Sequence, residues 1–89
     1  MEAIRNLEIC NKLGLHGRPA MLFVKLASGF SSEISVCKDD EEVDGKSLLG
    51  LMMLAAGCGS KIKIIARGED SQQAVAELSE LVKNKFNEE

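Results

Sequence analysis

Hydrophobic and polar residues alternate along three segments of the chain, and this period of two is typical of a β-strand with one buried face. The segments cover residues 4–10, 33–37 and 61–67. Val43 marks a further, short strand, and the acidic run at 38–42 before it is interpreted as a solvated hairpin connection. The side chains expected to face the core are Leu7, Ile9, Ile34, Val36, Ile62, Ile64 and Ala66.

Three other segments carry apolar residues three and four positions apart, which predicts helices with one buried side. The first covers residues 17–28. The second covers 48–54, with Ser47 as its N-cap. The third begins near residues 70–71. The side chains that this last helix is expected to bury are Val75, Leu78, Val82 and Phe86.

The order of these elements, together with strands that are apolar on one side only, predicts an α+β fold. We expect an open-faced sandwich (βαββαβα), in which a four-stranded antiparallel sheet carries three helices on one face and meets solvent on the other. A chain of 89 residues has room for one hydrophobic core. Residues 1–89 are therefore expected to form a single domain.

Composition excludes several classes of function. The net charge is −3 and the only aromatic residues are three phenylalanines, whereas proteins that bind nucleic acid are basic or offer aromatic rings for stacking. The N-terminus lacks the pattern of a signal peptide, and no apolar run approaches the roughly 20 residues of a membrane span. We therefore expect a cytoplasmic protein that neither binds nucleic acid nor inserts into membranes.

The three cysteines, Cys10, Cys37 and Cys58, are odd in number and far apart in the sequence, which favours reduced thiols over a disulfide framework. Together with His16 they would supply four ligands for zinc, but their spacing is not that of a zinc site. Buried thiols with a packing role are the preferred interpretation. Neither a metal nor a cofactor is expected.

The only histidine, His16, lies just before the first predicted helix and is followed by Gly17, Arg18 and Pro19. The first amides of a helix attract anions, proline is favoured in a first turn, and Arg18 adds positive charge. Histidine also keeps a neutral, nucleophilic nitrogen near neutral pH, because its unperturbed pKa is about 6.5. A nucleophile beside an anion site suggests phosphoryl transfer. On these residues alone, a structural domain in which His16 only caps the helix is an equal alternative.

The predicted helix at 48–54 is apolar nearly all the way round, with four leucines and two methionines among its seven residues. One interpretation places this helix deep in the core. The other exposes one side of it as a methionine-rich patch on which proteins dock. Spacing in the sequence does not show how near this helix lies to His16.

Two segments of the chain resemble the HPr family, the histidine-containing phosphocarriers of the bacterial phosphotransferase system. Gly14-Leu15-His16-Gly17-Arg18-Pro19-Ala20 is similar to the active-site motif of that family, and residues 45–54 resemble its regulatory-serine helix. The resemblance covers essentially the whole chain. It implies that His16 accepts a phosphoryl group on Nδ1 from phosphorylated enzyme I and passes it to IIA domains of sugar permeases.

The resemblance also implies roles for the residues around His16. Arg18 would neutralise the charge of the phosphate, and the backbone amides of Gly17 and Arg18 would donate hydrogen bonds to it. No second acid–base residue accompanies His16, so a carrier that is phosphorylated, and not an autonomous enzyme, is expected.

Partner docking and regulation are implied by position in the family. One side of the helix at 48–54 would form part of the docking surface for enzyme I and the IIA domains, and Leu51 and Leu54 on its other side would belong to the core. The protein is expected to be a monomer. Ser47 matches a serine that an HPr kinase/phosphorylase modifies in some bacteria, which would add negative charge to the docking surface. The docking residues implied in this way are Met21, Lys25, Leu48, Leu49 and Met52.

Some positions depart from the usual pattern of the family. Gly17 stands where alanine is usual, which gives a looser backbone beside the histidine, and Leu13 stands where many members have a small polar residue. The run at 11–14 and the acidic ending at 86–89 resemble the nitrogen-branch relative of HPr. Two alternatives to sugar uptake are therefore a nitrogen-branch phosphocarrier and a regulatory binding module that acts through Ser47.

Overall fold

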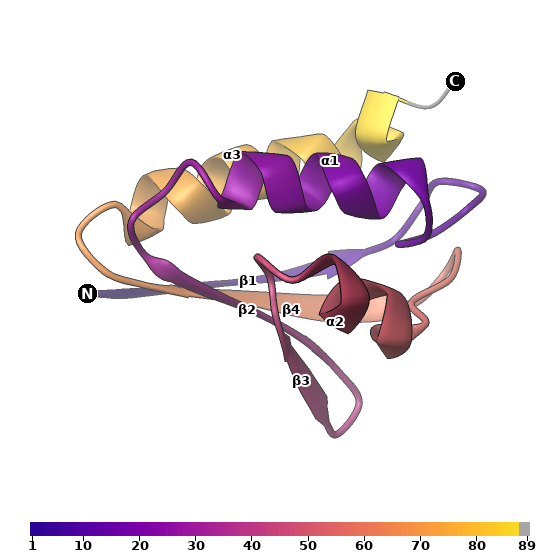
Figure 1. Ribbon diagram of the computed structural model, residues 1–89, viewed down its shortest axis with the longest axis horizontal. Coiled ribbons are helices and arrows are strands. Elements are labelled where there is room, and N and C mark those ends of the chain that lie inside the picture. The colour runs from indigo at the N-terminus through magenta and orange to yellow at the C-terminus, as the bar shows by residue number, and fades with distance from the viewer. Residues whose placement is uncertain (88–89) are drawn as a thin grey trace.

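The computed structural model describes residues 1–87, whose strands form one antiparallel sheet with the order β1-β4-β2-β3 (Figure 1). Each strand alternates inward and outward side chains, so the sheet has one face available for packing. The expected α+β open-faced sandwich with a four-stranded antiparallel sheet is confirmed. The strands are β1 (Glu2–Glu8), β2 (Glu33–Lys38), β3 (Glu41–Asp44) and β4 (Lys61–Arg67).

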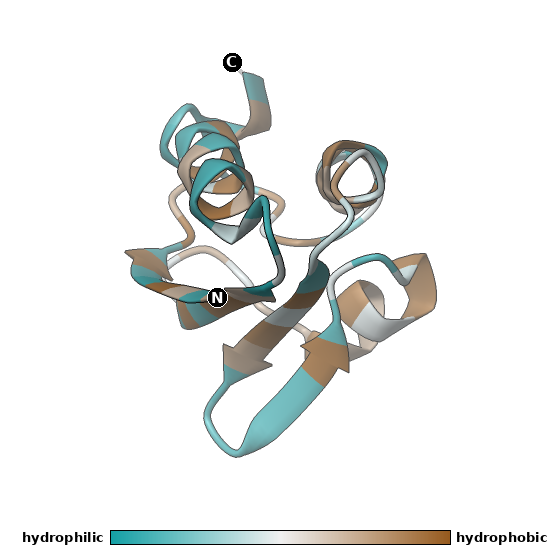
Figure 2. Cartoon of the chain, turned by 90° about the vertical axis from the view of Figure 1, so that its left-hand side faces the viewer, coloured by the Kyte–Doolittle hydropathy of each residue, from teal (hydrophilic) through white to brown (hydrophobic). Residues whose placement is uncertain are grey.

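Three helices lie along one side of the twisted sheet, and α1 and α3 run next to each other above it (Figures 1 and 2). They are α1 (Arg18–Ala27), α2 (Leu48–Leu54) and α3 (Ser71–Lys83). The predicted ranges agree with these bounds within one residue at α1 and α2. None of the helices in the described part of the chain is long and apolar enough to cross a membrane.

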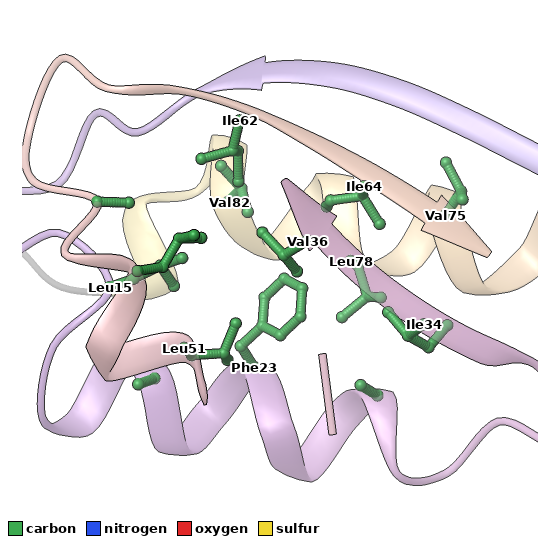
Figure 3. Close-up of a cluster of buried hydrophobic side chains, with 14 of the residues drawn as sticks. Leu15, Phe23, Ile34, Val36, Leu51, Ile62, Ile64, Val75, Leu78 and Val82 are labelled. Carbon is green, nitrogen blue, oxygen red and sulfur yellow. The ribbon is translucent and has the colours of Figure 1, made fainter. Parts of the chain in front are cut away.

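The core lies between the helices and the inner face of the sheet. Phe23 of α1 is fully buried and points toward Val36 of β2 and Leu78 of α3 (Figure 3). Leu51 and Leu54 of α2 are also buried, so the strands and all three helices contribute to one apolar cluster. This packing holds the loop that carries His16, because Leu15 belongs to the same cluster.

The end of α3 corrects one prediction. The helix stops at Lys83, and a short 3₁₀ turn covers Lys85–Asn87. Phe86 is fully buried as expected, but it reaches the core from this turn with a φ of 57°, not from the face of a continuous helix. Glu88 and Glu89, part of the acidic ending, lie outside the described residues.

Two strands also differ from their predicted extents. β1 covers residues 2–8 instead of 4–10, and Ile9 is fully buried although it lies just past the strand. Glu41 and Glu42 belong to β3, so the acidic run is not simply a connection, and only the residues between β2 and β3 turn the chain. The reason is that ladder pairing uses the backbone, and charged side chains are well tolerated on an edge strand.

The prediction of buried thiols is wrong. Cys10 and Cys58 are exposed, and Cys37 is half-buried. Cys10 and Cys58 lie in the loops next to β1 and β4, and Cys37 points to the outer face of the sheet because it alternates with the buried Val36. Within residues 1–87, the structure groups no three or more histidine, cysteine or carboxylate side chains that could hold a metal ion.

Asp70 links two connections that are far apart in the sequence. It precedes α3 as the N-cap residue, but its side chain makes no capping hydrogen bond. Its carboxylate instead accepts hydrogen bonds from the backbone N–H groups of Ser31 and Ser32, at 2.8 and 3.0 Å, and from both serine hydroxyls. These donors, with the Ser32 hydroxyl first, lower the pKa of Asp70 to about 2.

Candidate functional site

His16 lies exposed in the loop between β1 and α1. Its side chain borders a hollow of about 190 Å³ that is also lined by Leu13 and Leu15 of the same loop and by Ala55, Ala56 and Gly57. The last three residues directly follow α2. The structure therefore brings the C-terminal end of α2 next to the histidine, a proximity that the sequence did not reveal.

Contacts with the segment after α2 hold the His16 loop in place. The backbone N–H of Leu15 donates to the carbonyl oxygen of Ala56 at 2.8 Å. Gly14 has a φ of 66°, and a Cβ at this position would overlap the Ala56 carbonyl oxygen and lie 2.7 Å from Cα of Gly57. Only glycine fits both this backbone conformation and this close approach.

Asn11 closes the other side of the loop. It is almost fully buried, and its Nδ2 donates to the carbonyl oxygen of Gly14 at 3.0 Å. The N–H of Gly14 in turn donates to the Asn11 carbonyl oxygen at 3.3 Å. His16 thus lies on a loop that is held by hydrogen bonds within the loop and by a hydrogen bond to the segment after α2.

Helix α1 begins immediately after His16. Gly17 is the N-cap residue, with φ 56° and ψ −126°, and its carbonyl oxygen accepts the first helical hydrogen bond from Met21 N–H at 3.1 Å. Pro19 lies in the first turn, as predicted. A Cβ at Gly17 would meet no atom within 4 Å, so the backbone conformation alone favours glycine there.

The start of α1 creates a positive environment beside the imidazole. The N–H groups of the first helical turn have no partner within the helix, and they carry the positive end of the helix dipole. Arg18 is the first helical residue and its side chain is exposed, as is that of His16. The arrangement can therefore place a guanidinium and a backbone donor near an anion that is held at His16.

Helix α2 has one side in the core and one side exposed, so each interpretation of its apolar sequence holds for part of the helix. Leu51 and Leu54 are buried, whereas Leu49 and Met53 are 69% and 70% exposed. Ser47 is the N-cap, as predicted, and its Oγ accepts from the Gly50 N–H at 3.0 Å. One side of the helix therefore belongs to the core and the other side meets solvent.

The residues implied for docking differ in their exposure. Met21 and Lys25 of α1 are exposed, as are Leu48 and Leu49 of α2. Met52 is half-buried and packs against the core, so it offers less surface than the other four.

The His16 loop and α2 expose two further apolar residues that are not in the set implied by the resemblance. These are Met53 and Leu13, and the exposed fraction of Leu13 is 59%. Leu13 also lines the hollow with His16. Because α2 is apolar nearly all the way round, its sequence could not show that Met53 would face solvent.

Ser47 and His16 lie at opposite ends of α2. A helix rises about 1.5 Å per residue, so the seven residues from Leu48 to Leu54 span about 10 Å. Helices α1 and α2 contact each other and lie close together in Figure 2. The exposed side chains of α2 therefore lie between the serine and the histidine along the surface.

Comparisons with known proteins match this chain over nearly its full length. The family model described as PTS HPr component phosphorylation site matches residues 4–84. Phosphocarrier protein HPr of Treponema pallidum is 40% identical over 97% of this chain and 98% of its own. Phosphocarrier protein NPr of Shewanella violacea is also 40% identical, over 94% of this chain and 92% of its own.

A solved structure of HPr from Thermoanaerobacter tengcongensis has the same fold. It aligns with a TM-score of 0.95 at 46% identity and covers 98% of both chains. The similarity in structure therefore extends over the His16 loop, α2 and the C-terminal helix together.

Proposed function

The chain belongs to the HPr family of phosphocarrier proteins, and we propose that it carries the phosphoryl group on His16. The observation that carries this proposal is that His16 is exposed on a hydrogen-bonded loop, directly before the N-terminus of α1 and Arg18. A phosphocarrier is an intermediate in group transfer and needs no substrate pocket of its own.

The chemistry requires one nitrogen of the imidazole as the nucleophile. Nδ1 of His16 would form a bond to phosphorus while the bond that joins the phosphoryl group to phosphorylated enzyme I breaks. Arg18 and the first amides of α1 would offset the negative charge that arrives with the group. Because His16 and Arg18 are both exposed, a second protein can reach the phosphoryl group and remove it.

The partners proposed are enzyme I as donor and the IIA domains of permeases as acceptors. Both would dock on the exposed apolar side chains of α1 and α2, with Lys25 and Arg18 as neighbouring cations. A small apolar patch with a few charges suits a transient complex that must separate after each transfer. We add Leu13 and Met53 to the docking residues, because both are more than half exposed.

Ser47 is proposed as the regulatory position of this surface. Its Oγ lies at the N-terminus of α2, where a phosphate would be favourable for the helix itself. The neighbouring Leu48 and Leu49 are exposed, so the same phosphate would place charge inside the apolar docking surface. An HPr kinase/phosphorylase would therefore regulate docking, while His16, about one helix length away, keeps its own chemistry.

The test of the carrier function is phosphorylation by purified enzyme I and labelled phosphoenolpyruvate. We expect an acid-labile, alkali-stable label on the wild-type protein and none on His16→Ala. Ser47→Ala is the matched control, because it leaves the His16 loop unchanged and should still accept the label. Absence of label on the wild-type protein, or its presence on His16→Ala, contradicts the proposal.

The branch of the phosphotransferase system needs a second assay. We propose sugar uptake as the role, with the nitrogen branch as the alternative because both HPr and NPr relatives are about equally similar. The labelled protein is offered to a sugar-permease IIA domain and to a nitrogen-branch IIA protein in competition. Faster transfer to the nitrogen-branch protein would reject the sugar-uptake role.

A regulatory module that acts through Ser47 is the other alternative. In a strain that lacks the gene, His16→Ala would then restore function and Ser47→Asp would not. The carrier proposal expects His16→Ala to fail.

A further inference from the structure

The structure brings two cysteines together that are 48 positions apart in the sequence. Cys58 Sγ lies 3.9 Å from the carbonyl oxygen of Cys10. Both thiols are free and exposed. Cys10 opens the loop that carries His16, and Cys58 directly follows Gly57, which lines the hollow beside that histidine.

Backbone pairing sets the separation of these two residues. The Ile9 N–H donates to the Ser60 carbonyl oxygen at 2.8 Å, and the Gly59 N–H donates to the Ile9 carbonyl oxygen at 2.7 Å. Cys10 and Cys58 are the next residues outward on the two chains. Cys58 lies in the turn that the Ser60 N–H closes on the Gly57 carbonyl oxygen at 3.0 Å, and this turn holds its Sγ 3.9 Å from the Cys10 backbone. Such an approach is compatible with the Cα separation of about 4.4–6.8 Å found for disulfides.

We propose that Cys10 and Cys58 form a reversible disulfide, which makes them a redox modification site next to the His16 loop. The third cysteine, Cys37, is on the outer face of the sheet in β2 and does not take part. In the present structure Cys10 Sγ donates to the Glu8 carbonyl oxygen at 3.4 Å. This weak contact at the surface is given up when the Cys10 side chain rotates toward Cys58.

The oxidant is a low-molecular-weight disulfide, and the reaction is thiol–disulfide exchange. One cysteine thiolate attacks a sulfur of the small disulfide and releases one small thiol, which leaves a mixed disulfide on the protein. The second cysteine thiolate then attacks the protein sulfur of that mixed disulfide and releases the other small thiol. Two protein thiols are oxidised and one small disulfide is reduced, and the two protons leave with the small thiols.

The new bond would fasten the start of the His16 loop to the turn at residues 57–60. That loop is already attached to the segment after α2 through Leu15 and Ala56. The disulfide adds a covalent attachment at the loop's first residue and closes a long stretch of chain, which restricts the unfolded state. Formation of the bond does not depend on the phosphocarrier proposal, so the two can fail separately.

The test exposes the full chain to mixtures of oxidised and reduced glutathione, followed by alkylation and peptide mass analysis. We expect wild type and the control Cys37→Ser to form a linked Cys10–Cys58 peptide without a retained glutathione adduct. Cys10→Ser and Cys58→Ser should instead keep glutathione on the remaining cysteine. Stable adducts on both cysteines of the wild-type protein, a bond to Cys37, or a disulfide-linked dimer would overturn the proposal.

Thermal unfolding gives a second, independent readout. Oxidation should raise the Tm of wild type and Cys37→Ser, by on the order of 10 °C for a loop of this length. Neither Cys10→Ser nor Cys58→Ser should show the rise. A rise of the same size in Cys10→Ser or Cys58→Ser would show that the stabilisation does not come from this bond, and would contradict the proposal.

Discussion

Replacement of Gly14 by alanine tests how the His16 loop is held. Gly14 has a φ of 66°, and the new Cβ would overlap the Ala56 carbonyl oxygen. The backbone fixes the position of a Cβ, and the atoms it would meet in Ala56 and Gly57 are backbone atoms, so the clash cannot be relieved by rotation of a side chain. We expect the loop to move away from the segment after α2, which breaks the hydrogen bond from Leu15 N–H to Ala56.

The magnitude follows from three separate costs. A left-handed backbone costs a residue with a Cβ about 1–2 kcal/mol, and the lost hydrogen bond costs about 0.5–1.5 kcal/mol. Leu15 is 1% exposed, and full burial of a leucine is worth about 1.5–3 kcal/mol, of which part is lost when the loop moves. Together these terms predict that Gly14→Ala lowers the free energy of unfolding by about 3 kcal/mol or more.

Two other glycines provide matched controls. Gly17 has a positive φ but its Cβ would meet no atom within 4 Å, so Gly17→Ala has the backbone strain of about 1–3 kcal/mol without the clash. Gly57 has neither a positive φ nor a close neighbour. Gly57→Ala should be neutral or should stabilise by about 0.4–1 kcal/mol through the unfolded chain.

Urea unfolding of the three variants measures these differences as shifts of the midpoint at constant slope. The expected order of destabilisation is Gly14→Ala first, then Gly17→Ala, with Gly57→Ala close to wild type. The reasoning is refuted if Gly14→Ala is no more destabilising than Gly17→Ala, because the close contact with Ala56 would then have no energetic effect.

Three further predictions concern other parts of the molecule. Because the pKa of the Asp70 carboxylate is lowered to about 2 from 3.8, its stabilising effect is fully present above about pH 4 and is lost as the pH falls toward 2; acid unfolding monitored by circular dichroism should show this loss in wild type and not in Asp70→Asn. Ser47→Ala should lower the free energy of unfolding by about 1 kcal/mol, because it removes the cap on Gly50 N–H; Ser47→Asp retains a capping oxygen and should unfold like wild type in urea, but accept phosphoryl groups from enzyme I more slowly. Met53→Ser should raise the KM of enzyme I for this protein without a change in urea midpoint, since Met53 is 70% exposed; a stability loss with an unchanged KM would contradict its place in the docking surface.

Several elements of the fold could be predicted from the sequence because they depend on local patterns. The alternation in 33–37 and 61–67 corresponds to β2 and β4, and the side chains expected to point inward there are buried. Ser47 caps α2 and Pro19 lies in the first turn of α1. Such features depend on residues within a few positions of each other, where periodicity and side-chain capping are decisive.

Other features were decided by contacts between distant segments. The contact of Cys58 Sγ with the Cys10 carbonyl oxygen and the hydrogen bonds from Ser31 and Ser32 to Asp70 join parts of the chain that no local pattern connects. Phe86 enters the core from a left-handed turn, so its burial depends on the position of the core and not on helical spacing.

The candidate site shows the same division. The sequence by itself determined the chemical groups of the site, because His16, Arg18 and Pro19 are neighbours and their order already places a nucleophile before a helix. Only the tertiary structure decided what surrounds them: Gly14 packs on the segment after α2, and one side of α2 is turned to solvent. The physical reason is that an apolar helix buries whichever side meets the core, and the position of the core depends on the packing of the whole chain.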